Sequence, residues 1–229
     1  MIHRVAITGS TNDDARALAN AGAPHGDAVL ADVQTAGRGR LGRTWVAPPG
    51  VNLTLSVVLR PRVAAARVPL VCLAAAVAVA EACGPGWAIK WPNDVVDGAG
   101  RKLAGILAEA EWDGGRPSYV IVGIGVNVAA SPDGVGAVAL VDHGPTPSRD
   151  VLAVEVVHRL VAWVDRLSDD GPAALLDAWR GRAATLGRRV QVGDVEGIAV
   201  DIDGEGALLV SGDDGVVRRV LAGDVAMIG

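Results

Sequence analysis

Hydrophobic and polar positions in the first quarter of the chain follow the spacing of strands. Short apolar runs bounded by Gly, Pro, Asn and Asp are typical of strands. Three segments fit this pattern: residues 5–8, 27–34 and 52–59. Between the first two, Ser10, Thr11, Asn12 and Asp13 are side chains preferred at a helix N-terminus. They predict a helix through residues 15–21 that ends at Gly22.

The middle of the chain predicts one buried helix, more strands and two further helices. Residues 68–80 form an uncharged Ala- and Val-rich run, too short to cross a bilayer, and predict a buried helix that reaches residue 82. The other elements follow in order: strands at 87–91, 103–112 and 119–128, a hairpin turn at 97–100, a loop at 134–147, and helices at 148–167 and from Pro172.

After Gly187 the pattern changes to short apolar runs separated by Gly-Asp turns. Many short strands with such turns are typical of a small β-barrel. The chain is therefore expected to contain two domains, residues 1–186 and residues 187–229.

Charge and cysteine content narrow the function. The net charge is −5, and duplex nucleic acid normally requires a clear basic excess, so a nucleic-acid partner is not expected. Between Asp32 and Glu81 there is no acidic residue but six arginines, which indicates a small anionic ligand. The two cysteines, Cys72 and Cys83, have no C-x-x-C spacing and indicate buried thiols in a reducing, cytoplasmic location. No signal peptide or membrane span is predicted.

Lysine is rare, which makes the two that occur informative. Of the 21 basic residues 19 are Arg, and only Lys90 and Lys102 are Lys. An ammonium is a compact, rotatable charge that the planar guanidinium fork of Arg does not reproduce. The two lysines flank Trp-Pro-Asn-Asp, so we expect both to have a role that Arg cannot fill.

The segment Gly-Arg-Gly-Arg-Leu-Gly-Arg-Thr (residues 37–44) nearly fits two nucleotide-binding patterns. A dinucleotide fingerprint needs a helix directly after the glycines and a P-loop needs a helix and a Lys, but Trp-Val-Ala-Pro-Pro follows here. What remains is a flexible glycine loop that carries Arg38, Arg40 and Arg43. Glycine lets the backbone approach a ligand, and arginine binds phosphate or carboxylate bidentately. We expect this loop to become ordered around a labile anion.

Three further motifs have the residues of a binding site. In Lys90-Trp91-Pro92-Asn93-Asp94, Pro92 stiffens a turn that carries a lysine and two short polar side chains. In the segment 101–107, Lys102 begins an apolar strand in which Gly105 leaves room against the backbone. The segment 123–128 places Asn127 at the end of a strand with two glycines.

Together these motifs make the chain resemble the biotin protein ligase family. The resemblance covers the whole length and rests on motifs in the family's order: Ser10-Thr11-Asn12, Gln34 to Arg40 with Gly42-Arg43 and Trp45, Lys90 to Asp94, Lys102 to Leu107, and Gly123 to Val128. It implies an α/β (α+β) fold, with a class II aminoacyl-tRNA-synthetase-like mixed-sheet catalytic domain followed by a small SH3-like β-barrel.

The resemblance also implies a reaction. Biotin would be activated with Mg²⁺-ATP to biotinyl-5′-AMP and then transferred to a lysine of a biotin carboxyl carrier protein or domain. No protein-bound metal site is implied, and a homodimer is compatible with the family. Many members carry an N-terminal DNA-binding domain. Because only nine residues precede Ser10, we expect no repressor function here.

The residue roles come from the same resemblance. Lys102, Arg40 and Asp94 would be catalytic, with Asp94 orienting the incoming lysine. Biotin would be bound by the following set: Ser10, Thr11, Asn12, Gln34, Gly37, Arg38, Gly39, Arg40, Lys102 and Gly105. ATP would be bound by a second set: Arg38, Arg40, Arg43, Trp45, Lys90, Asn93, Lys102 and Asn127.

Two other functions fit part of the pattern. A lipoate ligase shares the fold and the adenylation chemistry but has no need for the Ser-Thr and Gln that would recognise a ureido ring. A non-enzymatic anion-binding regulator would use the loop and barrel without chemistry. ATP–pyrophosphate exchange with biotin or with lipoate separates the three functions.

Overall fold

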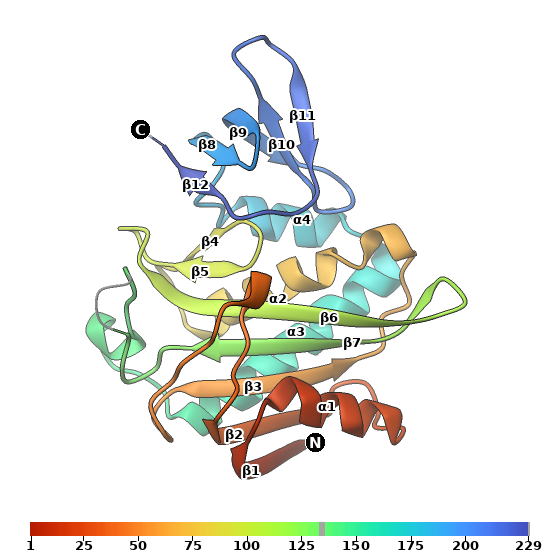
Figure 1. Cartoon of the computed structure of the whole chain (residues 1–229), viewed down its shortest axis with the longest axis vertical. Coiled ribbons are helices and arrows are strands. Elements are labelled where there is room, and N and C mark those ends of the chain that lie inside the picture. Colours follow the sequence, from red (N-terminus) through yellow and green to blue (C-terminus); the bar gives the residue numbers. More distant parts are fainter. Residues whose placement is uncertain (133–135, 229) are drawn as a thin grey trace.

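The computed structural model describes residues 1–132 and 136–228 and contains two β-sheets, one above the other in Figure 1. The larger is a seven-stranded mixed sheet in the order β1-β2-β3-β7-β6-β5-β4. Only β1 and β2 pair in parallel; the other neighbours are antiparallel. Its strands are β1 (Ile2–Thr8), β2 (Ala28–Gln34), β3 (Leu53–Leu59), β4 (Ala88–Lys90), β5 (Asp94–Val96), β6 (Lys102–Asp113) and β7 (Arg116–Val126).

The helices cover the two faces of this sheet unequally. On one face α1 (Thr11–Asn20) packs through Ala15 and Ala19 onto Val29, Val58 and Ile121. The opposite face is covered by α2 (Leu70–Ala82) and α3 (Arg149–Asp170), and α4 (Ala173–Arg180) lies beside α2. The part of the first face beyond α1 has no helix on it and is left for the site.

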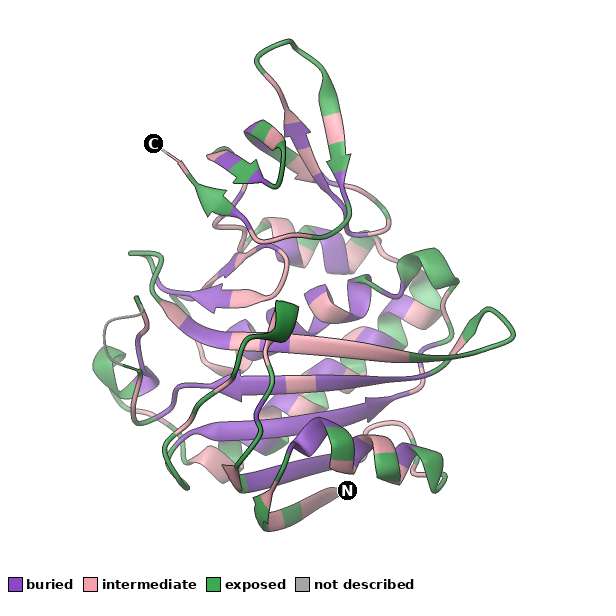
Figure 2. Ribbon diagram, in the orientation of Figure 1, coloured by how far each residue is buried: buried purple, intermediate pink, exposed green. Residues whose placement is uncertain are grey.

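The apolar run in the middle of the chain is the core helix that the sequence predicts. Ten of the thirteen residues of α2 are buried between the sheet and α3, and the central strands are buried as well (Figure 2). By length and composition the stretch Ala65–Ala82 could cross a membrane, but most of it is buried inside the molecule, as in the core helix of a globular protein.

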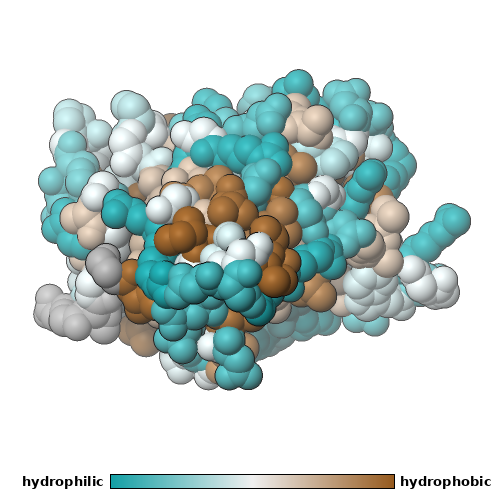
Figure 3. Space-filling view, turned by 90° about the horizontal axis from the view of Figure 1, so that it is seen from above, coloured by the Kyte–Doolittle hydropathy of each residue, from teal (hydrophilic) through white to brown (hydrophobic). Residues whose placement is uncertain are grey.

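The C-terminal sheet is antiparallel, as the turn-rich pattern after Gly187 predicts. It has the order β11-β10-β9-β8-β12 and is built from β8 (Arg189–Val192), β9 (Val195–Ile202), β10 (Leu208–Ser211), β11 (Val217–Val220) and β12 (Ala226–Met227). Seen from this end of the molecule, apolar side chains gather in the middle of a hydrophilic surround (Figure 3). Exposed apolar residues of this sheet and its loops are Ile198, Val200, Val216, Val217, Leu221 and Met227.

The main differences from the sequence prediction are short elements. The turn at Pro92, which has a cis Trp91–Pro92 bond, joins β4 to a three-residue strand, β5, that the pattern does not predict. Short 3₁₀ helices occur at Arg40–Gly42, Ala65–Arg67 and Leu140–His143. The last of these lies in the segment predicted as a loop, of which residues 134 and 135 lie outside the described residues.

Candidate active site

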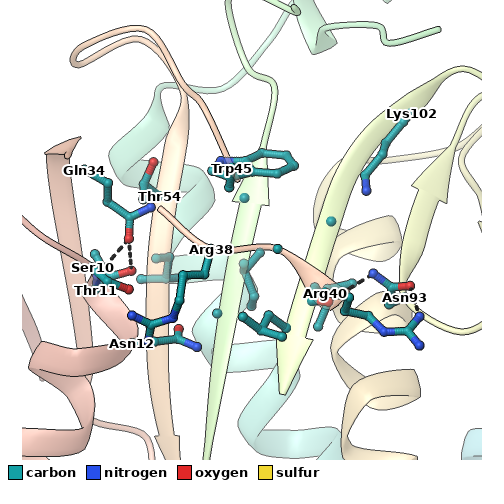
Figure 4. A pocket seen from close by; sticks show the side chains of 18 residues that line it. Ser10, Thr11, Asn12, Gln34, Arg38, Arg40, Trp45, Thr54, Asn93 and Lys102 are labelled. Carbon is teal, nitrogen blue, oxygen red and sulfur yellow. Dashed lines mark hydrogen bonds between the residues drawn. The ribbon is translucent and has the colours of Figure 1, made fainter. Parts of the chain in front are cut away.

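A pocket opens on the face of the large sheet that α1 leaves uncovered. The N-terminus of α1 forms one side, the glycine–arginine loop (residues 37–44) forms the roof, and strands β3, β7 and β6 form the floor, on which Trp45 packs (Figure 4). Polar side chains lie at one end together with Arg38, whose charge is paired with Asp13, and two further cations, Arg40 and Lys102, lie at the other. The pocket therefore has an uncharged end and a cationic end.

The uncharged end is a chain of hydrogen bonds between buried polar groups. Gln34 Oε1 accepts from the backbone N–H of Thr11 at 2.7 Å and from its hydroxyl at 2.9 Å. The Ser56 hydroxyl lies 2.7 Å from Thr11 Oγ1 and 2.6 Å from Asn12 Oδ1. Thr11, Asn12 and Ser56 are buried. Groups held this way are pre-organised to exchange hydrogen bonds with a polar, uncharged ligand.

The cationic end is built where the loop meets β5 and β6. Arg40 donates to Asn93 Oδ1 at 2.7 Å and to the carbonyl of Gly223 at 3.3 Å, so the loop also contacts the C-terminal sheet's connecting segment. Lys102 Nζ lies 2.7 Å from Asp94 Oδ1. The strand register brings these two groups together. Asp94 on β5 lies opposite Gly105 on β6, and the Lys102 side chain packs against Gly105. Two cations that face one cavity favour an anionic ligand there.

Trp45 forms a wall between the two ends, and glycines make room for it. A Cβ at Gly125 would lie 2.2 Å from the indole, and one at Gly105 would lie 3.2 Å from it. Lys102 Nζ sits 5.8 Å from the centre of the ring, a cation–π distance. Among the described residues the buried Trp45 Nε1 has no hydrogen-bond partner.

Two loop arginines are paired with carboxylates outside the pocket's centre. Arg38 donates to both oxygens of Asp13 at 2.7 Å, and these hydrogen bonds lower the pKa of Asp13. Arg43 is ion-paired with Asp224 of the C-terminal domain. The two ends of the loop are therefore tied to different parts of the molecule.

The structure brings most of the predicted site residues together. Those that line the pocket are Ser10, Thr11, Asn12, Gln34, Arg38, Gly39, Arg40, Trp45, Asn93, Lys102 and Gly105. Asp94 does not line the pocket itself, but it forms an ion pair with Lys102, which does. The buried Asn127 lies below the start of β6, and its amide donates to the carbonyls of Lys102 and Val138.

Five predicted residues lie outside the lining: Asp94 and Asn127, described above, and Gly37, Arg43 and Lys90. Gly37 packs under Trp45, where a Cβ would lie 2.4 Å from the Trp45 carbonyl oxygen. Arg43 and Lys90 line a neighbouring polar cleft with Asp224. Lys90 and Lys102 thus flank the same turn but face different cavities.

Several lining residues are not among the predicted site residues. Thr54 and Leu55 lie outside every motif, whereas Ile106, Leu107, Gly123, Ile124 and Gly125 lie within the motifs at 102–107 and 123–128 but have no predicted role. The glycines offered a signal, since glycine inside a strand often marks a close approach. Gly123 makes room for Asn12, whose Oδ1 would lie 2.3 Å from a Cβ there. The apolar residues are indistinguishable in sequence from core residues.

Comparison with known proteins agrees with this geometry. The model of the biotin/lipoate A/B protein ligase family matches residues 5–127, and that of the biotin protein ligase C-terminal domain matches residues 185–227. The biotin–[acetyl-CoA-carboxylase] ligase of Paracoccus denitrificans is 41% identical, over 95% of this chain and 96% of its own length. The enzyme of the same name from Mycobacterium tuberculosis is 40% identical, over 96% and 86%.

A solved structure gives the same result for the fold. The biotin protein ligase from Aquifex aeolicus in complex with biotin and ATP superimposes with a TM-score of 0.81 at 26% identity, covering 99% of this chain and 98% of that one. The predicted α/β domain with its small C-terminal β domain is thereby confirmed. With matches at this identity along nearly its whole length, the chain belongs to the biotin protein ligase family.

Proposed function

We propose that both steps of biotin ligation take place in this one pocket. In the first, a biotin carboxylate oxygen attacks the α-phosphorus of Mg²⁺-ATP, and pyrophosphate leaves. In the second, a carrier lysine amine attacks the acyl carbon of biotinyl-5′-AMP, and AMP leaves as the amide forms. The observation that carries the proposal is the division of the pocket by Trp45 into an uncharged hydrogen-bonding end and a cationic end.

The uncharged end would hold the ureido ring of biotin. Ser10, Thr11 and Gln34 supply hydroxyl, amide and backbone groups there, and Asn12 continues the network. Gly37 and Gly39 let the loop backbone close over the bicyclic ring. The carboxylate at the other end of the ligand would then point toward Lys102 and Gly105.

The cationic end would stabilise the charge that develops during both steps. Lys102 would bind the biotin carboxylate and then the α-phosphate, and Arg38 and Arg40 would surround the mixed anhydride. Lys102 is paired with Asp94 in this structure. A phosphate that takes over Lys102 would free the Asp94 carboxylate to accept a hydrogen bond from the carrier lysine.

The remaining ATP contacts would lie around this end. Asn93 and Trp45 line it, Arg43 and Lys90 line the adjoining polar cleft, and Asn127 lies behind Lys102, to whose carbonyl it donates. Within residues 1–132 and 136–228 no three His, Cys, Asp or Glu side chains cluster as a metal site would require. We expect Mg²⁺ to arrive with the ATP phosphates.

The uncharged end also discriminates against the alternative substrate, lipoate. A lipoyl ring offers no N–H or C=O groups, so it would leave the pocket-lining polar groups of Thr11 and Gln34 without ligand partners, which costs free energy. The network therefore favours biotin over lipoate.

Further features of the function rest on composition and on the fold. The partner would be a biotin carboxyl carrier domain, docked near the loop and β5. A homodimer is compatible with the fold, and the net charge of −5 disfavours nucleic acid. We place the domain division between residues 186 and 187, shortly before β8 begins at Arg189. Unpaired Cys72 and Cys83, whose pKa values burial raises to about 12, fit a cytoplasmic location.

Calorimetric titration tests the proposal. Biotin should bind, and a non-hydrolysable biotinyl-AMP mimic should bind far more tightly because it fills both ends. ATP–pyrophosphate exchange should depend on biotin and not on lipoate. Absence of biotin binding would refute the assignment of the uncharged end, and exchange with lipoate alone would move the substrate to the alternative.

A further inference from the structure

We propose that Glu109 is a positioning residue that fixes the donor–acceptor polarity of the pocket's uncharged end and so selects a ligand ring that presents N–H donors. The inference rests on the proposed function, because it explains how that end recognises the ureido N–H groups of biotin. Glu109 lies on β6, beside the hydrogen-bond chain and outside every motif in the sequence.

The contacts of Glu109 determine how the Asn12 amide is turned. Glu109 Oε2 accepts from Asn12 Nδ2 at 2.7 Å and from Arg16 at 3.1 Å. An ionised carboxylate can only accept hydrogen bonds, so the NH₂ group of Asn12 must face Glu109. Its Oδ1 then faces Ser56, in the space that Gly123 leaves by having no side chain.

This orientation leaves the hydrogen-bond chain one hydrogen short. Three oxygen–oxygen contacts run from Asn12 Oδ1 to Ser56, from Ser56 to Thr11 and from Thr11 to Gln34 Oε1. Both amide oxygens are pure acceptors, and the two hydroxyls supply one hydrogen each. Gln34 cannot reverse, because its Oε1 also accepts from the Thr11 backbone N–H.

A turned Asn12 would remove the deficit. Its Nδ2 would donate to Ser56, Ser56 to Thr11 and Thr11 to Gln34, so that each contact would have its hydrogen. Glu109 prevents this arrangement and keeps an excess of acceptors on side chains that line the pocket, namely Thr11, Asn12 and Gln34. A ligand N–H supplies the missing hydrogen, and leaving buried acceptors without one is costly.

The charges around Glu109 belong to the loop as well as to α1. Arg16 on α1 and Arg38 of the glycine–arginine loop, at 3.1 and 3.8 Å, face the carboxylate. Asp13 pairs with both arginines. Glu109 thus stands between the uncharged end and the base of the loop.

Exchanging the two polar partners tests the proposal. Asn12→Asp should raise the biotin Kd at pH 7.5 by about tenfold or more, because two carboxylates then face each other. Adding Glu109→Gln should return the Kd to within about threefold of wild type. The introduced glutamine amide can donate to one oxygen of the introduced aspartate, whose other oxygen still accepts from Ser56.

The pH dependence separates this role from a structural one. In the single Asn12→Asp variant, like charges raise the pKa of the pair, so a shared proton should restore the donor to Glu109 and tighten biotin binding at pH 5.5. The double variant should show no such recovery. Both titrations use the whole chain, biotin and isothermal calorimetry, with thermal unfolding as the check of folding.

Two more variants keep the test decisive. Glu109→Ala frees the Asn12 amide to turn and should raise the biotin Kd about tenfold, whereas Glu111→Gln, on the same strand but exposed, should leave it unchanged. A folded Asn12→Asp or Glu109→Ala single variant that binds biotin within twofold of wild type would overturn the role, as would a double variant that binds no more tightly than Asn12→Asp. Failure of wild type itself to bind biotin would instead refute the proposed function.

Discussion

At the scale of single residues, the shape of Lys102 decides what it can do. Its Nζ fits between Asp94 at 2.7 Å and the Trp45 ring, directly above Gly105. A planar guanidinium is wider and cannot occupy this space with the same contacts. We expect Lys102→Arg to slow biotin-dependent ATP–pyrophosphate exchange by about a hundredfold or more, the loss seen when a charge-stabilising donor is displaced.

The second lysine provides the matched control. Lys90 lines the neighbouring cleft, so Lys90→Arg should reduce the exchange rate much less than Lys102→Arg does. If Lys90→Arg and Lys102→Arg reduced the exchange rate equally, the requirement for lysine would not depend on whether the side chain faces the main pocket. Near-normal turnover of Lys102→Arg would remove the proposed role of Lys102.

The glycines of the floor are a second residue-scale feature with a measurable consequence. Gly125→Ala would place a methyl group 2.2 Å from the Trp45 indole, so the ring must move out of its position between the two ends. We expect a biotin Kd at least about tenfold weaker, together with a loss of stability of about 1–3 kcal/mol from overpacking. Calorimetry and thermal unfolding measure the two effects.

Gly98→Ala is the control for that substitution. Gly98 lies in the turn between β5 and β6, and a Cβ there meets nothing within 4 Å. The Gly98→Ala variant should therefore bind biotin as wild type does. Unchanged binding by Gly125→Ala would mean that Trp45 does not form the wall between the pocket's two ends.

At the scale of elements, the glycine–arginine loop is held at its middle by Arg40. Its guanidinium bonds to Asn93 on one side and to Gly223 of the C-terminal domain on the other. Without it the loop loses both of these contacts at its middle, together with the cation that we propose lies over the anhydride. We expect Arg40→Gly to release biotinyl-5′-AMP, so that added proteins such as serum albumin become biotinylated on exposed lysines, which blotting with streptavidin detects.

An Arg43 variant distinguishes two roles of the loop, its attachment to the C-terminal domain and its retention of the anhydride. Arg43 is ion-paired with Asp224 and does not line the pocket, so Arg43→Gly should weaken ATP use while labelling stays specific to the carrier. Strict carrier specificity in the Arg40→Gly enzyme would contradict the retention role.

The helices and strands also show which features can be predicted from a single sequence and which cannot. Strands with alternating or fully apolar patterns and the buried α2 follow from hydrophobic periodicity, since burial imposes the period. The strand β5 has three residues, too few for a period. Ser56 and Glu109 escaped prediction for a different reason: their partner Asn12 lies 44 and 97 residues away, and only sheet register brings them together.

At the scale of the whole molecule, Trp91 joins the two sheets. Its backbone N–H donates to Thr185 at 2.9 Å and its indole Nε1 donates to the carbonyl of Gly206 at 3.0 Å, both buried. The turn at Gly206 packs in return on α2, where a Cβ would lie 3.1 Å from Leu70 and 3.2 Å from Leu73. The tryptophan of the Lys-Trp-Pro-Asn-Asp motif thus positions the C-terminal domain, whose Gly223 and Asp224 hold the loop.

Removing one hydrogen bond at this joint should therefore affect both stability and catalysis. Trp91→Phe keeps an aromatic ring but leaves the Gly206 carbonyl without its donor, which costs about 1–3 kcal/mol for a buried group. We expect a lower denaturation midpoint in urea and a raised KM for ATP, because Gly223 and Asp224 shift with the sheet. Trp112→Phe, on the exposed β6–β7 hairpin, should change neither. An unchanged midpoint for Trp91→Phe would show that the two sheets are held together elsewhere.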